Sequence, residues 1–240
     1  MTIVLTPGAA SLSLLERIYR GEESFQLDRS ARNGVDRAAE IVLAAKDNET
    51  PIYGINTGFG KLASARIEKS DIDQLQRNLI LSHSAGVGEP LASPVTRLVI
   101  ALKLLSLGRG ASGVRWQIVE HIEAIVEAGI LPIIPSQGSV GASGDLAPLA
   151  HLGLVLAEGD HGHVFFQGTP MSASEGMKRA GIGRLQLEAK DGLAITNGAQ
   201  LTTAIGTLAL HDASSLVEAA ELAASMSIEA LRGASRAFVE

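Results

Sequence analysis

The sequence predicts a mainly α-helical fold with a minor β-hairpin, and three observations support this class. Of the 240 residues, 46% are hydrophobic and only 3% are aromatic, so the core must be built from Ala, Leu, Ile and Val. This mixture suits closely packed helices. Several long segments repeat apolar residues at helical spacing, and turns that contain glycine separate them.

The first predicted elements are short. Residues 3–5 are expected to form a strand. A capping box at Ser13 and Glu16 then predicts a helix that ends near Arg20. Residues 33–46 carry apolar side chains on one face and form the second predicted helix.

Residues 50–64 are rich in glycine and lack apolar periodicity, so we expect a mobile loop that includes Tyr53. From the residues alone, Tyr53 is best interpreted as a rim tyrosine whose hydroxyl satisfies a backbone group. A capping box at Ser70 and Asp73 predicts another helix, which ends near His83. A histidine at a helix end usually interacts with the helix dipole.

The middle of the chain contains its most apolar helices. Residues 94–107 are apolar on every face, which predicts a buried helix. Residues 114–126 show a single apolar stripe that ends at Gly129. After a glycine-rich stretch, we expect a helix that runs to about Ala157 and then a strand or hairpin at residues 161–166.

The last part of the sequence is again helical. Ser172 and Glu175 predict the start of a short helix, and a long helix follows an interruption at residues 196–198. We therefore divide the chain into a first domain, residues 1–198, and the start of a long helical bundle, residues 199–240. Because the helical pattern continues almost to the last residue, we expect an N-terminal portion of a longer fold. Its exposed apolar surface should find partners.

Charge and composition argue against several functional classes. The net charge is −6 and the isoelectric point is about 5.6, so nothing indicates a surface for nucleic acid or an anionic membrane. The chain has no cysteine, which excludes disulfides and thiol catalysis. It lacks a signal-peptide pattern, and its most apolar run, residues 146–157, is too short to span a bilayer, so we expect a cytoplasmic protein. His161 and His163 have no third ligand nearby, so no metal site is expected.

Residues 138–149 have the sequence Gly-Ser-Val-Gly-Ala-Ser-Gly-Asp-Leu-Ala-Pro-Leu. Glycine allows backbone conformations that a β-carbon forbids, and Asp145 and Pro148 both suit the first turn of a helix. One interpretation is therefore an anion-binding loop at a helix start. A phosphate-binding loop of the G-x-x-x-x-G-K-[ST] type is absent, however, and two prolines interrupt the segment that would be the preceding strand.

The tripeptide Ala142-Ser143-Gly144 also has a chemical interpretation. The nitrogen of Gly144 has no side chain beside it, and the carbonyl of Ala142 is flanked only by a methyl group. In a tightly bent loop, this nitrogen can close a five-membered ring on that carbonyl. Loss of the Ser143 hydroxyl as water then leaves an exocyclic methylene. The product is an electrophile, which the ordinary twenty side chains do not provide.

The whole stretch resembles the signature of the aromatic amino acid ammonia-lyases. In that family, Ala-Ser-Gly becomes the prosthetic group 4-methylidene-imidazol-5-one (MIO). The resemblance therefore implies that Ala142, Ser143 and Gly144 form MIO and that Asp145 supports its formation. It also implies the fumarase/aspartase-like helical bundle of the family, and a homotetramer whose active sites draw on several subunits.

Three other segments share this resemblance. Residues 53–60 are similar to the family's mobile inner loop, whose tyrosine is the catalytic base, which implies that role for Tyr53. Residues 78–88 resemble the histidine-specific version of the segment that selects the substrate side chain, which implies that His83 binds the substrate. The sequence Leu-Ala-Ile-Thr-Asn-Gly resembles the segment whose asparagine contacts the MIO region, here Asn197.

Together these resemblances imply elimination of ammonia from L-histidine to give trans-urocanate, a reaction of histidine degradation. A tyrosine-directed lyase or aminomutase is the first alternative, because His83 can hold a phenol hydroxyl equally well. A non-catalytic helical scaffold or inert fragment is the second. Members of the family are longer, and the later segments that supply a glutamine, a second tyrosine, an arginine and a glutamate are not present in this sequence.

Overall fold

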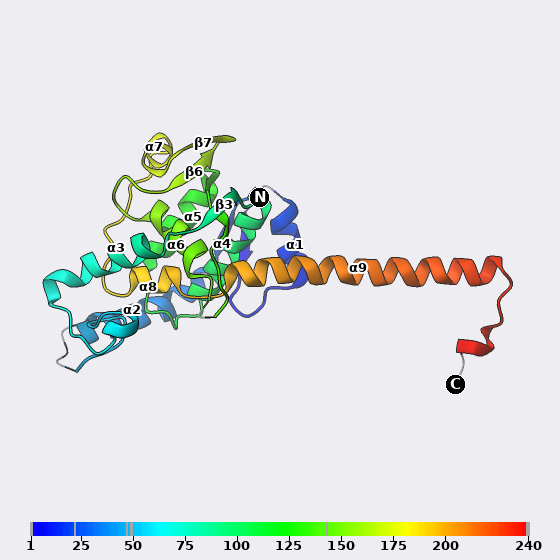
Figure 1. Ribbon diagram of the computed structural model, residues 1–240, viewed down its shortest axis with the longest axis horizontal. Coiled ribbons are helices and arrows are strands. Elements are labelled where there is room, and N and C mark those ends of the chain that lie inside the picture. The colour runs from blue at the N-terminus through cyan, green and yellow to red at the C-terminus, as the bar shows by residue number, and fades with distance from the viewer. Residues whose placement is uncertain (1, 22, 47, 49, 143, 239–240) are drawn as a thin grey trace. The chain divides into compact units, whose positions relative to one another are not determined.

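A computed structural model describes the chain at residues 2–21, 23–46, 48, 50–142 and 144–238 (Figure 1). The structure confirms a mainly helical fold with small sheets. The helices of the described residues are α1 (Leu12–Arg20), α2 (Arg32–Lys46), α3 (Ile72–His83), α4 (Ser93–Leu107), α5 (Trp116–Glu127), α6 (Leu146–Leu156), α7 (Ala173–Arg179), α8 (Asp191–Thr196) and α9 (Gln200–Ala230), with 3₁₀ turns η1 (Arg29–Ala31), η2 (Gly60–Leu62), η3 (Lys69–Asp71) and η4 (Ser235–Phe238).

The strands form three small sheets. They are β1 (Ile3–Leu5), β2 (Phe25–Leu27), β3 (Val87–Pro90), β4 (Ile130–Pro132), β5 (Pro135–Gln137), β6 (His163–Phe166) and β7 (Thr169–Ser172). β1 pairs with β2 in parallel, β3 pairs with β5 antiparallel, and β4, β6 and β7 form an antiparallel sheet of three strands. The predicted strand in residues 3–5 is confirmed, and the strand or hairpin predicted at residues 161–166 is found as the strand β6, whereas β2, β3, β4, β5 and β7 were not predicted.

The chain divides into two compact units, Met1–Ala204 and Ile205–Glu240, and the boundary falls within α9. The core of the first unit lies around α4, α5 and α6. Each of these helices is buried on most of its faces, as the continuous apolar pattern of residues 94–107 predicts. Side chains that are fully buried in these three helices include Leu98, Ile100, Leu104, Ile118, Ile122, Leu149 and Leu152.

Helix starts only partly follow the predicted caps. The cap of α1 is Ser11, whose hydroxyl accepts a hydrogen bond from the amide of Leu14, so the predicted cap at Ser13 is wrong. At α7, Ser172 accepts from the amide of Glu175 as predicted. Both hydroxyls satisfy amide groups that a helix leaves without an internal partner.

The predicted capping box at Ser70 and Asp73 is also wrong. The chain enters α3 through the 3₁₀ turn η3, and the cap residue Asp71 makes no side-chain hydrogen bond to the first turn. The 3₁₀ turn carries the chain into the helix in place of a side-chain cap. In the described part of the chain, no helix combines the length and apolar character needed to cross a membrane.

Candidate active site

The glycine-rich stretch ends in a close backbone contact between Gly144 and Gly198. These two residues form an isolated parallel bridge, and the amide of Asp145 donates to the carbonyl oxygen of Gly198 at 2.7 Å. Gly144 has a φ of +103°, and a β-carbon at this position would lie 2.4 Å from the oxygen of Gly198. Only glycine fits this site without a shift of the backbone. Ser143 lies outside the described residues.

Asp145 is fully buried, and its carboxylate accepts three hydrogen bonds. The hydroxyl of Ser139 and the hydroxyl of Thr202 donate to Oδ1, each at 2.7 Å. The amide of Thr202 donates to Oδ2 at 2.8 Å. A buried carboxylate needs such donors, because they replace the water that it loses.

This arrangement corrects the expectation that Asp145 caps the next helix through its side chain. Asp145 is the cap residue of α6 by position, but its carboxylate makes no bond to the first turn of that helix. The side chain instead connects the loop to the start of α9 through Thr202. Sequence spacing alone identifies a cap position, but it cannot reveal a partner 57 residues away.

Asn197 lies at the C-terminal end of α8 and its side chain is exposed. Its carbonyl oxygen accepts a hydrogen bond from Nζ of Lys103 at 2.7 Å. Lys103 is only 1% exposed, and burial lowers the pKa of its amine to about 7. Lys103 was not predicted as a site residue from the sequence, although a lysine within a helix that is otherwise apolar on all faces was a usable signal.

His83 is the last residue of α3 and is half-buried. Its Nδ1 lies 2.8 Å from the carbonyl oxygen of Leu79, which requires a proton on Nδ1, so that in the neutral tautomer Nε2 is an acceptor. The predicted location at a helix end is confirmed. The following turn approaches the glycine-rich stretch, since a β-carbon on Gly138 would lie 3.1 Å from Cα of Gly86.

That turn is held by His151 of α6. The amide of Gly86 donates to Nε2 of His151 at 3.2 Å, which requires this nitrogen to be unprotonated. Burial, and then the neighbouring charge of His163, lower the pKa of His151 and favour the neutral ring. The segment of His83 and the helix that follows the glycine-rich stretch are therefore joined directly.

Tyr53 lies in the expected loop and is 54% exposed. Its ring packs edge to face on Phe59, with centroids 6.0 Å apart, and its hydroxyl has no hydrogen-bond partner among the described residues. The next residue, Gly54, contacts α8, because a β-carbon there would lie 2.3 Å from Cδ2 of Leu193. The loop of Tyr53 thus packs against α8, the helix that Asn197 follows.

The structure therefore brings together three of the segments that contain predicted site residues, through close contacts of their glycines. Gly198 contacts the loop of Gly144, and Gly54 contacts α8. Within the described residues, no hydrogen bond joins the side chains of Tyr53, His83 and Asn197. A hollow of about 320 Å³ is lined by Ala111, Ser112, Lys190, Leu193, Ala194, Asn197 and Gly198.

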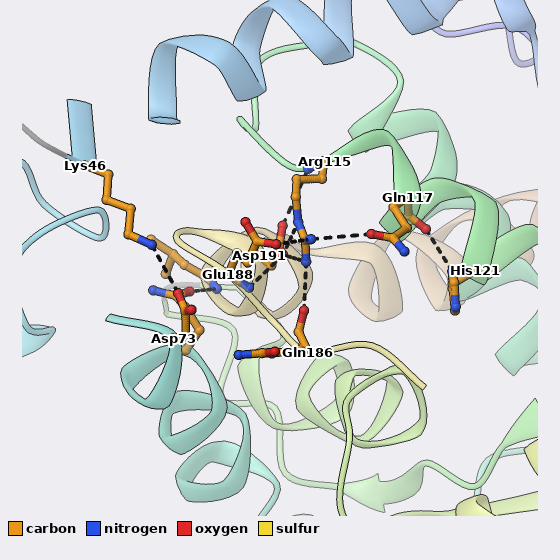
Figure 2. A network of polar contacts seen from close by, with 10 residues as sticks. Lys46, Asp73, Arg115, Gln117, His121, Gln186, Glu188 and Asp191 are labelled. Atoms are coloured by element: carbon orange, nitrogen blue, oxygen red, sulfur yellow. Dashed lines mark hydrogen bonds and ion pairs between the residues drawn. The ribbon is translucent and has the colours of Figure 1, made fainter. Parts of the chain in front are cut away.

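The beginning of α8 is held by a second polar cluster that the sequence analysis missed (Figure 2). Asp191 is fully buried, and Arg115 donates to its Oδ2 from Nε at 2.9 Å and from Nη2 at 2.6 Å. The amide of Glu188 donates to the same oxygen at 3.0 Å. Burial raises the pKa of Asp191, although the hydrogen bonds from Arg115 act in the opposite direction.

Across the described ranges, no group of three or more acidic or histidine side chains could hold a metal ion. The residues that could carry a cofactor are those of the glycine-rich loop. Ala142 is exposed, Gly144 has the backbone approach described above, and the buried carboxylate of Asp145 anchors the loop. A small, bent and anchored backbone of this kind fits MIO, which would be built from the loop itself.

A family model described as "Aromatic amino acid lyase" matches residues 10–240. The chain belongs to the aromatic amino acid lyase family. This family contains ammonia-lyases and aminomutases and uses MIO.

Solved structures agree with this assignment. Histidine ammonia-lyase from Trypanosoma cruzi is 33% identical with a TM-score of 0.87, and the match covers 98% of this chain and 46% of that one. Tyrosine aminomutase from Streptomyces globisporus is 31% identical with a TM-score of 0.89, over 100% of this chain and 44% of that one. Phenylalanine aminomutase from Pantoea agglomerans is 30% identical with a TM-score of 0.89, and the match covers 99% of this chain and 45% of that one. The chain thus spans less than half the length of these relatives.

Proposed function

We propose that this chain is the part of a histidine ammonia-lyase in which Ala142, Ser143 and Gly144 form MIO. The proposal rests on one observation: the backbone of Gly144 approaches Gly198 so closely that no side chain fits. The buried carboxylate of Asp145 supports ring formation, because it fixes the residue next to the tripeptide. MIO supplies an electrophile for the substrate amine, which makes ammonia a better leaving group.

The other proposed site residues bind and orient the substrate or move its proton. Tyr53 takes the β-proton, since the residue is exposed and its hydroxyl has no hydrogen-bond partner among the described residues. His83 holds the imidazole of L-histidine, because its Nε2 is free to accept a hydrogen bond while Nδ1 is bound to Leu79. Asn197 positions the amine beside the loop.

The substrate assignment rests on His83. Relatives named for histidine, tyrosine and phenylalanine are similarly distant, so overall identity does not discriminate between them. A tyrosine ammonia-lyase or aminomutase is the second candidate, and the hydrogen-bonding capacity of His83 is consistent with a phenol. A non-catalytic helical scaffold is the third candidate. In each case we expect a cytoplasmic protein with no metal, nucleic-acid or membrane partner.

We also propose that the chain forms homo-oligomers, and tetramers in its longer form. Several large apolar side chains of α9 are exposed in the second unit, among them Leu210, Leu216, Leu222 and Met226. Apolar surface of this kind normally lies in an interface. A monodisperse monomer in light scattering would contradict this proposal.

The substrate is tested by incubating the longer protein, of which we propose this chain to be a part, with L-histidine or L-tyrosine and identifying the products. The proposal predicts urocanate from histidine, and a much lower rate with His83→Leu, because the leucine removes the acceptor for the imidazole. Loss of about 1–3 kcal/mol of binding would lower kcat/KM by roughly five- to 150-fold. The matched control is His121→Leu, at a half-buried histidine of α5 whose Nδ1 contacts the carbonyl oxygen of Gln117 in its own helix. Coumarate or β-tyrosine from tyrosine, without urocanate from histidine, would reject the histidine assignment.

A further inference from the structure

Lys103 is a buried cation in the core of the first unit. It lies on α4 among residues that are almost all apolar, and 1% of its surface is exposed. Burial of a charged amine without a carboxylate is costly, because the amine loses its water. An apolar residue would fill the same position at a lower cost, so helix packing does not explain why a lysine is found there.

Among the described residues, the amine of Lys103 has one hydrogen-bond partner. Nζ donates to the carbonyl oxygen of Asn197 at 2.7 Å, and no acidic side chain of the described residues forms an ion pair with it. Burial is the cause that lowers the pKa of Lys103 to about 7. Both the ammonium and the neutral amine carry N–H groups, so the hydrogen bond to Asn197 persists on either side of that pH.

The carbonyl group that Lys103 binds lies one residue before the carbonyl group that contacts the glycine-rich loop. Asn197 is followed by Gly198, whose φ is +131° and whose carbonyl oxygen accepts from the amide of Asp145 at 2.7 Å. The same carbonyl oxygen is the atom that a β-carbon on Gly144 would strike. Lys103 and the loop therefore hold two consecutive carbonyl groups of one turn.

We propose that Lys103 is a positioning residue that holds the Asn197–Gly198 turn against the MIO-forming loop. The proposal deepens the proposed function and rests on it for the consequence in catalysis. The amine contacts neither the tripeptide nor a substrate. It acts through the backbone of Asn197, which also carries the side chain proposed to position the substrate amine.

The test compares Lys103→Met, which keeps an unbranched side chain of similar length and removes the donor, with Lys103→Arg, which keeps a cationic donor. Lys178→Met, at an exposed lysine of α7, is the matched control. Hydrogen exchange of the Asp145 amide reports on the turn, because this amide is bonded to Gly198. The amide of Leu185, bonded to the carbonyl of Leu156 at 2.8 Å, reports on the opposite end of α6.

We expect Lys103→Met to accelerate exchange at Asp145 by about tenfold or more, with Leu185 unchanged, because the lost bond is local. Lys103→Arg should restore most of the protection, and Lys178→Met should have no effect. Equal exchange at Asp145 in Lys103→Met and the unaltered chain would overturn the proposal, as would equal acceleration at Asp145 and Leu185. If Lys103→Met does not fold, Lys103→Arg decides: wild-type protection at Asp145 supports the proposal and its loss overturns it.

Stability measured against pH separates positioning from ordinary core packing. The folded protein holds fewer protons on Lys103 than the unfolded chain does between pH 7 and the ordinary lysine pKa of 10.5. The wild-type midpoint in urea should therefore rise from pH 7 to pH 9 relative to that of Lys103→Met. At pH 6 the methionine variant should be at least as stable as the wild type, while its turn is looser. If Lys103→Met were less stable than the wild type at pH 6 as well as at pH 9, the lysine would have a purely structural role.

The two proposals can fail separately. If the intact mass shows no loss of water from the unaltered chain, the proposed MIO is not formed, and exchange at Asp145 still decides the role of Lys103. If MIO forms at the same rate in Lys103→Met, with unchanged exchange at Asp145, only the positioning role is rejected.

Discussion

Gly144 is the residue at which the proposed site is most sensitive to substitution. A β-carbon there would lie 2.4 Å from the oxygen and 3.0 Å from the carbon of Gly198, and φ is +103°. Both obstacles are backbone atoms, so a flexible side chain cannot move aside to relieve the clash. Gly141 also has a positive φ, +69°, but nothing lies within 4 Å of its added β-carbon.

These two glycines form a matched pair for mutation. We expect Gly144→Ala to lower the free energy of unfolding by about 3 kcal/mol or more, from strain and overpacking together. Gly141→Ala should cost about 1 kcal/mol, since only the backbone conformation opposes it. Urea denaturation of the two variants measures the difference. Equal stability of the two would show that the contact between Gly144 and Gly198 does not constrain the loop.

At the scale of single residues, the sequence predicts which residues belong to the candidate site better than it predicts which groups those residues contact. The stretch around Gly144 is identifiable from its glycines, and His83 lies at a helix end as expected. The carboxylate of Asp145 was assigned to a helix cap, whereas it binds Ser139 and Thr202. Local spacing favours a cap, but burial decided the outcome, because a buried carboxylate needs all the donors within its reach.

At the scale of elements, α8 positions the candidate site although it is only six residues long. A helix of this length is not stable alone, so its ends must be held by the rest of the fold. Arg115 holds its first residue through Asp191, as Figure 2 shows, and Lys103 holds the residue after its last turn. The sequence predicts the interruption at residues 196–198, but not these long-range partners.

The ion pair of Arg115 and Asp191 should therefore matter far more than a surface pair. We expect Asp191→Ala to lower the free energy of unfolding by about 3 kcal/mol, because it leaves Arg115 and the amide of Glu188 without their shared acceptor. Arg179→Ala removes an exposed pair with Glu175 and should cost less than about 0.5 kcal/mol.

Urea denaturation of both variants tests the contrast. A cost for Asp191→Ala no larger than that for Arg179→Ala would show that α8 does not depend on this pair. The pKa of Asp191 is raised by burial, so its ionised form is already disfavoured, and the pair contributes less than its geometry alone implies. The expected cost comes mainly from the lost acceptor.

At the scale of the whole molecule, helical class and most helix positions follow from periodicity. The buried helices α4, α5 and α6 lie where continuous apolar patterns predict them. The small sheets β3–β5 and β4–β6 were harder to predict, because their strands have three or four residues and several contain proline. Pairings such as that of Ile130 with Phe166 depend on tertiary contacts that a local pattern does not encode.

The central claim concerns the chain as a whole, because the tripeptide can cyclise only if the surrounding fold keeps the loop bent. In this structure the constraint comes from Gly198, Asp145 and the start of α9. All three belong to the first unit, Met1–Ala204, which contains its own core. The 240-residue chain should therefore be able to form the ring without further segments.

The most direct test is the intact mass of the purified chain, compared with that of Ser143→Ala. Ring formation removes two water molecules, so we predict that the unaltered chain is lighter than its sequence mass by that amount, and that a peptide containing residues 142–144 carries the whole difference. The Ser143→Ala chain should fold with the same helical content and lack the methylidene. An unaltered chain at its full sequence mass would contradict the claim that this loop forms MIO.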